Sequence, residues 1–277
     1  MNQNSHVFSG GSELDRARVN PSTMSDRPLE ERPKLEAIAI CKQFQELSVL
    51  ENINLQVHQN ELVCIVGASG CGKSTLLNII AGLMTPTSGQ VLVDGEVVLG
   101  PGSDRGMIFQ NYSLFPWLTV AENIGFGLEL GSMSKPEKTE RINYFLEVVG
   151  LRKFAQAYPK ELSGGMKQRV AIARSLANEP EVLLMDEPFG ALDAQTKEQM
   201  QQFLLQLWQQ THTTILMITH DVEEAIFLSQ RIYIMAAHPG HIQEEISIDL
   251  PPVRDLEMKL CLDFLEIKKT VIHSLRR

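Results

Sequence analysis

The segment Leu62–Thr75 reads LVCIVGASGCGKST, and it contains the pattern that decides the fold. Its first five residues are a continuous apolar run, typical of a strand buried on both faces of a parallel sheet. Residues 67–75 match the pattern GxxxxGK[ST], a glycine-rich loop that leads into a helix. Such a loop can turn its backbone N–H groups toward phosphate oxygens, and the helix N-terminus adds positive potential. The segment therefore predicts a nucleotide phosphate site.

The residues of this loop have distinct predicted roles. The Lys73 ammonium is expected to reach the β- and γ-phosphates, and the Ser74 hydroxyl is expected to ligate Mg²⁺. Cys71 is interpreted as a small tolerated residue rather than a redox switch. The residues predicted to contact the nucleotide here are Gly67, Ser69, Gly70, Cys71, Gly72, Lys73, Ser74 and Thr75.

Strand-like and helical segments alternate outward from this loop. Short apolar runs bounded by turn residues predict strands at 35–40, 62–66, 106–109, 182–185, 214–218 and 231–235. Helical patterns lie at 73–81, 120–130, 137–149, 165–178, 194–210, 222–228 and 256–275. This alternation predicts an α/β fold with a mostly parallel sheet. Because the stretch from about residue 114 to 178 is almost all helical, we expect a helical subdomain inserted there.

Composition excludes several classes of protein. The chain has 277 residues and a formal net charge of −9. Proteins that bind nucleic acid usually carry a basic excess, so no nucleic acid partner is expected. No apolar run approaches the roughly 18 residues that span a bilayer. Four scattered cysteines without a CxxC pair indicate neither a zinc site nor a disulfide framework. Residues 1–33 are polar, and we predict a disordered tail there and a globular domain over 34–277.

A pair of acidic residues stands at the end of a predicted strand. The segment Val182–Glu187 reads VLLMDE, a buried-strand pattern that ends in two carboxylates. Asp186 is expected to hold Mg²⁺ through water, and Glu187 is placed to polarise an attacking water at the edge where parallel strands bind ligands. The alternative is a solvated acidic pair at a strand end, which the nearby phosphate loop makes the weaker interpretation.

A third sequence motif resembles that of a known family. The segment Leu162–Met166 reads LSGGM and precedes a strong helical pattern. Ser163 and two glycines at a helix N-terminus form a second anion cradle. A plain loop with an N-cap could use the same residues, although not in this order and spacing relative to the other two elements. The segment resembles the LSGGQ signature of ATP-binding cassette (ABC) proteins, departing from it at Met166.

The resemblance implies the fold and the assembly of that family. An ABC nucleotide-binding domain combines a P-loop core with a mostly parallel sheet, an antiparallel β region and an inserted helical subdomain. Two cassettes pair head to tail, and each ATP lies between the P-loop of one chain and the signature of the other. The implied signature contacts are Ser163, Gly164 and Gly165. ATP and Mg²⁺ are the implied cofactors.

Further positions match the motifs of the family one by one. Gln110 corresponds to the Q-loop glutamine, which touches Mg²⁺ and water, and Asp193 to the D-loop at the dimer interface. His220 corresponds to the switch histidine that contacts the γ-phosphate. Phe44 stands where an aromatic ring stacks on adenine, although a role in the core remains open for it. The resemblance implies Glu187, His220, Gln110 and Lys73 as catalytic residues, and Ser74, Gln110 and Asp186 as metal-binding residues.

Three kinds of ABC protein are considered for this chain: an importer subunit, a soluble ATPase not coupled to transport, and the cassette of an exporter. The segment Asp186–Asp193, DEPFGALD, resembles importer cassettes, and the interval 75–162 has no room for the long coiled coils of DNA-acting members. The segment Phe109–Val120, FQNYSLFPWLTV, resembles importers of nitrate, sulfonates, taurine and related anions such as bicarbonate. We therefore expect a peripheral subunit at the cytoplasmic face of the inner membrane. Its expected partners are an identical or similar cassette, two transmembrane permease subunits and, indirectly, an extracytoplasmic solute-binding protein.

Overall fold

The computed structural model describes residues 32–277. The tail expected over residues 1–33 lies outside the described residues except at Arg32 and Pro33. Among residues 32–277, no helix is both long and apolar enough to cross a membrane.

The larger sheet contains the strand predicted before the phosphate loop, β3 (Leu62–Gly67). Its strand order is β10-β9-β3-β8-β7-β6, and only β10 runs antiparallel to its neighbour. Because the other five strands are parallel, their carboxyl ends meet at one edge. The remaining strands of this sheet are β6 (Arg105–Ile108), β7 (Val182–Asp186), β8 (Thr214–Thr219), β9 (Arg231–Ala236) and β10 (His241–Ser247).

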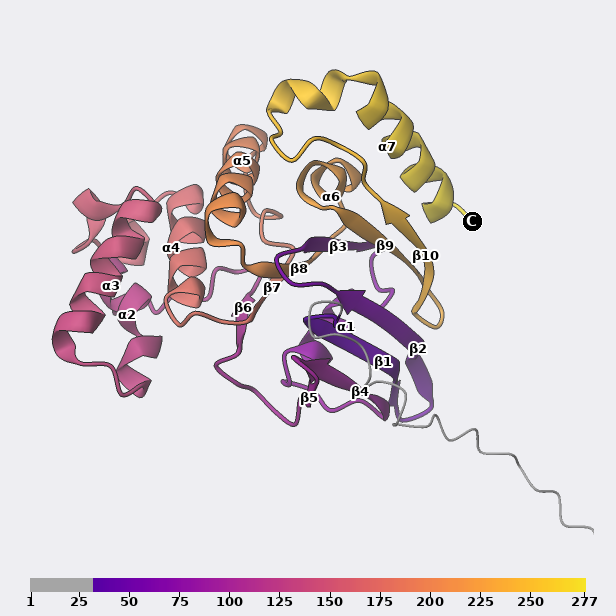
Figure 1. Ribbon diagram of the computed structural model, residues 1–277, viewed down its shortest axis with the longest axis horizontal. Helices are drawn as coiled ribbons and strands as arrows, with labels where there is room; N and C mark the ends of the chain where they lie inside the picture. The colour runs from indigo at the N-terminus through magenta and orange to yellow at the C-terminus, as the bar shows by residue number, and fades with distance from the viewer. Residues whose placement is uncertain (1–31) are drawn as a thin grey trace, which may run out of the picture. The chain divides into compact units, whose positions relative to one another are not determined.

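A smaller antiparallel sheet lies beside it, with the order β2-β1-β4-β5 (Figure 1). Helix α1 (Lys73–Ile80), which follows the phosphate loop, packs between the two sheets, and apolar side chains from both surround it. The strands of this sheet are β1 (Leu35–Phe44), β2 (Leu47–Val57), β4 (Ser88–Val93) and β5 (Glu96–Val97). A mostly parallel core with a separate antiparallel sheet confirms the predicted fold class.

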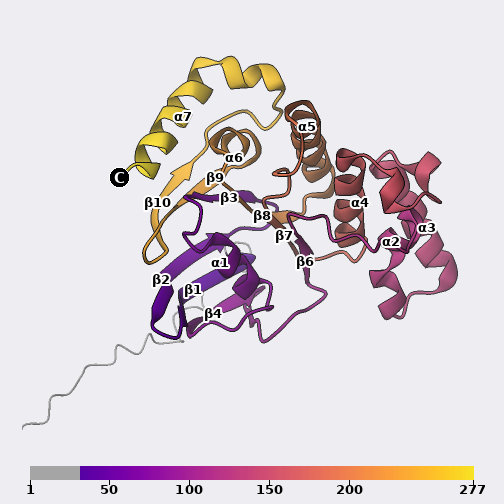
Figure 2. The same cartoon turned by 180° about the vertical axis from the view of Figure 1, so that it is seen from behind.

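The helices between β6 and β7 form a group of their own, seen at the left of Figure 1 and from behind in Figure 2. These are α2 (Val120–Gly125), α3 (Lys135–Val148) and α4 (Gly164–Leu176), with short 3₁₀ segments at 127–130, 152–154 and 159–161. The other helices are α5 (Ala194–Thr211), α6 (Val222–Leu228) and α7 (Leu262–Leu275), the last preceded by a 3₁₀ turn, Leu256–Leu260.

Side-chain hydrogen bonds cap the N-terminus of α2, the first helix of this group. The Thr119 hydroxyl accepts the Glu122 N–H at 3.3 Å, while the Glu122 carboxylate accepts the Thr119 N–H at 2.7 Å. This reciprocal capping box satisfies two N–H groups that the helix leaves unpaired. Fully buried Asn123 also exchanges hydrogen bonds with the backbone of Phe115. The loop that leads from β6 into α2 is thereby fixed in place.

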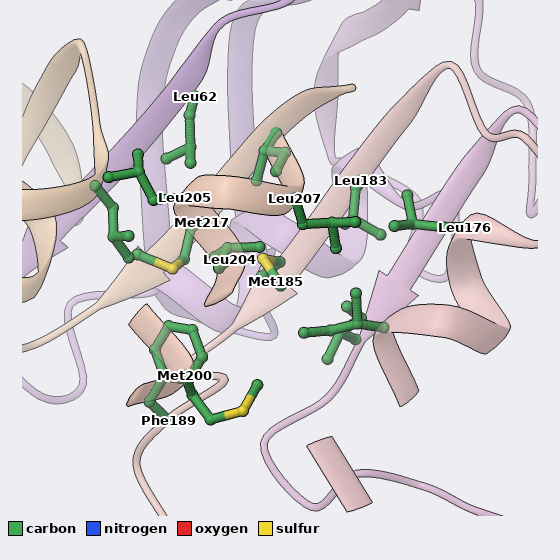
Figure 3. Packing of buried hydrophobic residues seen from close by; sticks show 14 of the residues in the cluster. Leu62, Leu176, Leu183, Met185, Phe189, Met200, Leu204, Leu205, Leu207 and Met217 are labelled. Atoms are coloured by element: carbon green, nitrogen blue, oxygen red, sulfur yellow. The ribbon is translucent and has the colours of Figure 1, made fainter. Parts of the chain in front are cut away.

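The parallel sheet separates two apolar cores. On one face, Met185 of β7 and Met217 of β8 pack with Leu204 of α5, as Figure 3 shows. On the other face, Ile65 of β3 belongs to the cluster that includes Leu77 of α1. The sheet is therefore buried on both sides, which is why its central strands are continuous apolar runs.

Two predicted helices are shorter than the sequence suggested. The helix expected over 256–275 is interrupted at Cys261, whose extended backbone (φ −75°, ψ 156°) separates the 3₁₀ turn from α7. The helix expected over 120–130 ends at Gly125 and continues as 3₁₀ geometry from Gly127. Glycine lowers helix stability, which accounts for the second break.

A buried arginine ties the segment before α7 to α6. The Arg254 Nη1 atom donates to the carbonyl oxygens of Ile226, Phe227 and Ser229 at 2.9–3.0 Å, and its Nε donates to Pro251. Burial lowers the pKa of the Arg254 guanidinium. The unpaired carbonyls at the C-terminal end of α6 are thus satisfied from outside the helix.

The core makes a direct prediction about stability. Leu204 is fully buried, so Leu204→Ala is expected to lower the free energy of unfolding by about 2–5 kcal/mol through lost burial and a residual cavity. Leu99, which is 94% exposed, is the matched control, and Leu99→Ala should change it by less than about 0.5 kcal/mol. Urea unfolding followed by tryptophan fluorescence measures both values. Equal losses for the two variants would contradict the assignment of the core.

Candidate functional site

The phosphate loop leaves β3 at Gly67 and enters α1 through Gly72. Gly72 has φ 100° and Gly70 has φ 80°, in the left-handed region that other residues rarely adopt. The two glycines therefore allow the tight turn that the motif predicted. Cys71, between them, is buried.

Lys73 lies inside this loop. Its side chain is buried, and its ammonium donates to the carbonyl oxygens of Gly67 at 2.8 Å and Ala68 at 2.9 Å. These contacts hold the cation within the curve of the loop. A fixed positive charge at that place suits the β- and γ-phosphates of a nucleotide.

Ser74 and Asp186 meet at the same edge, as a Mg²⁺ site would require. The Ser74 hydroxyl donates to Asp186 Oδ1 at 3.3 Å. Burial raises the pKa of the Asp186 carboxyl, and Glu187 reinforces the shift, whereas the Ser74 hydrogen bond and Lys73 oppose it. The negative charges of these two neighbouring carboxylates repel each other, and a divalent cation bound there would relieve that repulsion. Among the described residues, no cluster of three His, Cys, Asp or Glu side chains could hold a metal ion.

Glu187 and His220 form a pair at the ends of β7 and β8. The distance between Glu187 Oε2 and His220 Nδ1 is 3.0 Å. Register pairs Asp186 with Ile218, and the Glu187 N–H donates to the Ile218 carbonyl at 3.0 Å. Glu187 has φ 44°, a strained conformation for a residue with a side chain. The sheet therefore fixes the backbone of Glu187, and the carboxylate lies beside an exposed imidazole.

Gln110 reaches the same loop from β6. A Cβ placed on Gly190 would lie 3.4 Å from Gln110 Nε2 and 3.8 Å from Glu187 Oε2, so both side chains flank this glycine. The structure therefore brings Gln110, Glu187 and His220 together, beside Asp186 and Ser74. These are five of the residues that the sequence motifs singled out.

The loop that carries Gln110 is held by a residue that no motif predicted. Tyr112 and Ser113 have φ of 41° and 49°, which is strained for residues other than glycine. Arg174, in the last turn of α4, donates to the Ser113 carbonyl at 2.7 Å and to the Tyr112 carbonyl at 3.3 Å. Its guanidinium also lies 5.2 Å from the centre of the Phe115 ring. Arg174 therefore stabilises the strained loop through main-chain contacts.

The signature residues lie at the start of α4 and not at the phosphate loop. The Ser163 Oγ accepts the Met166 N–H at 3.3 Å and caps the helix. A Cβ on Gly164 would contact Leu192, and one on Gly165 would contact Thr196 of α5. Figures 1 and 2 show α4 well separated from α1. The second anion cradle is therefore distinct from the first within one chain.

Asp193 caps the next helix. It accepts the Thr196 N–H at 3.0 Å and the Thr196 hydroxyl at 2.7 Å, and these bonds lower the pKa of its carboxyl. Asp193 is exposed beside Leu192, which packs near the signature. It therefore belongs with the second cradle in space.

Phe44 is the last residue of β1 in the smaller sheet. Its ring is 44% exposed, and the Lys42 ammonium lies 5.0 Å from the ring centre. This exposure argues against the core role left open for it. An accessible ring is what stacking on a purine requires.

An ionic network connects α5 to α6 next to His220. The Lys197 ammonium lies 2.6 Å from Asp221 and 3.2 Å from Glu224. Burial raises the pKa of the Asp221 carboxyl, but Lys197 and the backbone N–H groups of Glu223 and Glu224 together outweigh that effect and leave the pKa lowered. At Glu224 burial dominates and leaves the pKa raised. Sequence patterns did not mark these residues, because each resembles an ordinary charge on a helix surface.

Comparisons with known proteins agree with this arrangement. Residues 50–190 match the family described as ABC transporter. The chain is 63% identical over 202 residues to the nitrate import ATP-binding protein NrtD of Synechocystis sp., covering 73% of this chain and 76% of the relative. It is 49% identical over 236 residues to the aliphatic sulfonates import ATP-binding protein SsuB of Bacillus cereus, covering 85% and 92%.

A solved structure gives the same result for the fold. The dimeric structure of MJ0796, described as a bacterial ABC transporter cassette, superposes with a TM-score of 0.68 at 35% identity. The match covers 78% of this chain and all of that chain. With a family match over half of its length and close relatives along most of it, this chain belongs to the ATP-binding proteins of the ABC transporter family.

Proposed function

We propose that this chain is the ATP-hydrolysing, energy-coupling subunit of an importer for a small anion, with nitrate the first candidate. The observation that carries the hydrolytic part is the Glu187–His220 pair, set beside Ser74 and Asp186 at the edge of the sheet. The importer part is supported by relatives whose names describe nitrate, aliphatic sulfonate and taurine import. Sulfonates, taurine and bicarbonate are the other candidate solutes.

In this proposal the phosphate loop binds ATP and Lys73 neutralises its β- and γ-phosphates. Ser74, Asp186 and Gln110 would hold Mg²⁺, which supplies further charge neutralisation when bound. Phosphoryl transfer requires mainly positioning and electrostatic stabilisation. The fixed position of each side chain at the sheet edge is therefore the main contribution of the protein.

Glu187 and His220 would position the attacking water. Glu187 accepts a hydrogen bond from the protonated Nδ1 of His220, and Nε2 would donate to a γ-phosphate oxygen when it also carries a proton. The carboxylate orients the water, and the imidazole contacts the γ-phosphate side. The bond from the Glu187 N–H to the Ile218 carbonyl anchors the backbone from which this carboxylate extends.

The signature cradle would serve the nucleotide of a second cassette. Helix α4, which begins at Ser163, Gly164 and Gly165, lies apart from α1 of the same chain, and this supports head-to-tail pairing of two copies. The second cassette is either identical or a close paralogue. In both cases each ATP is bound by two chains.

A groove beside the Gln110 loop is the proposed docking site for the permease. It has a volume of about 1190 Å³, and its lining includes Phe109, Phe115, Phe126, Leu130 and Met133. The Phe115 ring also lies 5.7 Å from that of exposed Trp117. A short amphipathic helix of a transmembrane subunit fits a groove that combines these apolar side chains with charged ones such as Glu137 and Arg141. The chain would then lie on the cytoplasmic face of the inner membrane, fed by an extracytoplasmic solute-binding protein.

Glu187→Gln tests the catalytic assignment. The amide keeps the size of the side chain but loses the charge that orients water, so turnover should fall by at least about 100-fold while ATP binding remains. ATPase assays and equilibrium binding of radiolabelled ATP measure the two effects. Glu198→Gln, at an exposed position, is the control and should match the wild type. Normal turnover of Glu187→Gln would refute the role of this carboxylate.

Mixing variants tests the shared site. Ser163→Arg should abolish turnover because the arginine blocks the cradle offered to the partner, and Lys73→Ala should abolish it by removing the phosphate cation. A mixture of the two variants should regain turnover, since a mixed dimer has one site with an intact phosphate loop and an intact signature. Steady-state ATPase rates measure this. No recovery in the mixture, with both variants folded, would argue against head-to-tail pairing.

Affinity capture tests the transport assignment. A tagged chain isolated from its native membranes in mild detergent should bring a multispanning permease with it, as mass spectrometry can establish. The assembly in proteoliposomes, supplied with its binding protein, should then hydrolyse ATP faster with nitrate than without. Capture of soluble proteins or ribosomes alone would leave the ATPase activity standing and overturn the importer.

A further inference from the structure

The turn between β9 and β10 is attached to β2. The Gly240 N–H donates to the Val49 carbonyl at 2.9 Å, and the Glu51 N–H donates to the Gly240 carbonyl at 2.9 Å. These bonds form an isolated parallel bridge between Leu50 and Gly240. Figure 1 shows the β9–β10 hairpin reaching across to β2. Gly240 is therefore fixed in position by a different sheet from its own.

Gly240 lies directly against the phosphate loop. A Cβ on this residue would come closer to the Cys71 carbonyl oxygen than the 3.0 Å that real Cβ contacts respect. It would also lie 2.6 Å from Met235 Cε and 3.0 Å from the Val49 carbonyl oxygen. The φ of Gly240 is outside the left-handed region, so close approach rather than backbone freedom requires glycine here.

The same two strands enclose the loop at its ends. A Cβ on Gly67 would collide with the carbonyl oxygen of Met235 in β9. A Cβ on Gly72 would lie 2.6 Å from Leu50 Cδ2 in β2. The loop is thus held between β9 and β2, and Gly240, which is bonded to β2 and follows β9, closes the space between them.

The contact at Cys71 bears on phosphate binding because a peptide unit is rigid. The Cys71 carbonyl and the Gly72 N–H belong to one planar trans unit, so they point in opposite directions. An obstacle that displaces the carbonyl oxygen must rotate the N–H with it. Backbone N–H groups of this loop are the donors that a phosphate would use.

We propose that Gly240 is a positioning residue for the phosphate loop, acting through the Cys71 carbonyl to set the direction of the Gly72 N–H. The inference rests on the proposed nucleotide site at residues 67–75. It assigns a role in ATP binding to the β9–β10 turn, more than 160 residues beyond the loop in the sequence.

Gly240→Ala in the full chain is the test. The added methyl group displaces the Cys71–Gly72 peptide, so the KM for ATP and the Kd for radiolabelled ATP with Mg²⁺ should rise about tenfold, as expected for one charge-assisted hydrogen bond. The kcat at saturating ATP should stay within about twofold, since Glu187 and His220 are not touched. Gly100→Ala is the matched control: a Cβ there meets nothing within 4 Å, and its φ is also outside the left-handed region.

Comparing the change in KM with the change in kcat distinguishes a positioning role of Gly240 from a purely structural one. A fold-destabilising change would lower the active fraction and kcat while the surviving molecules kept the wild-type KM, and that result would overturn the proposal. An unchanged Kd in folded Gly240→Ala would also overturn it. If Lys73→Ala loses ATP binding while Gly240→Ala retains it, the positioning role fails and the nucleotide site stands; if the wild type does not bind ATP, the site itself fails.

A second pair of variants covers the case in which Gly240→Ala does not fold. Met235→Ala removes the side chain that also opposes the new methyl group but leaves the Cys71 carbonyl in place. The double variant Met235→Ala/Gly240→Ala lacks the clash between the new methyl group and the Met235 side chain, and it should still bind ATP about tenfold more weakly than Met235→Ala alone. Equal affinity of the double variant and Met235→Ala would show that side-chain crowding, and not the carbonyl contact, requires glycine.

Discussion

The parallel register of the larger sheet is the constraint on which the rest of the structure depends. Pairing of β3 with β9 and of β7 with β8 brings Gly67 opposite Met235 and Asp186 opposite Ile218. Parallel strands end at one edge, so loops that are far apart in the sequence meet there. A slip of one residue would turn every buried side chain to the opposite face, and the two cores forbid it.

That sheet also contributes side chains to both apolar cores. Along β3, Val63 and Ile65 pack toward α1 and the antiparallel sheet, while Cys64 and Val66 pack toward the helices on the other face. Successive side chains of a strand point to opposite faces, so one short strand belongs to both cores. Both cores therefore pack directly against the strand that leads into the phosphate loop.

The elements predicted from the sequence were those with a strong local signal. Continuous apolar runs located β3 and β8, and motif spacing located Lys73, Asp186 and His220. Strand β2 escaped notice because bulges shift its register and much of it is exposed. Strand β10 escaped because it is an edge strand of alternating exposure. Arg174 and Gly240 act on backbone carbonyls of distant segments, a contact that leaves no pattern in the residues on either side.

The contacts of Arg254 determine where the domain can be cut or extended. The guanidinium satisfies three carbonyls at the end of α6, whose other end begins beside His220. The segment after the sheet therefore supports the helix that follows His220, although it lies beyond residues 50–190 that match the family. A truncation before Arg254 would leave those carbonyls buried without donors, whereas a fluorescent protein or affinity handle fused after Arg277 would leave every one of these bonds in place.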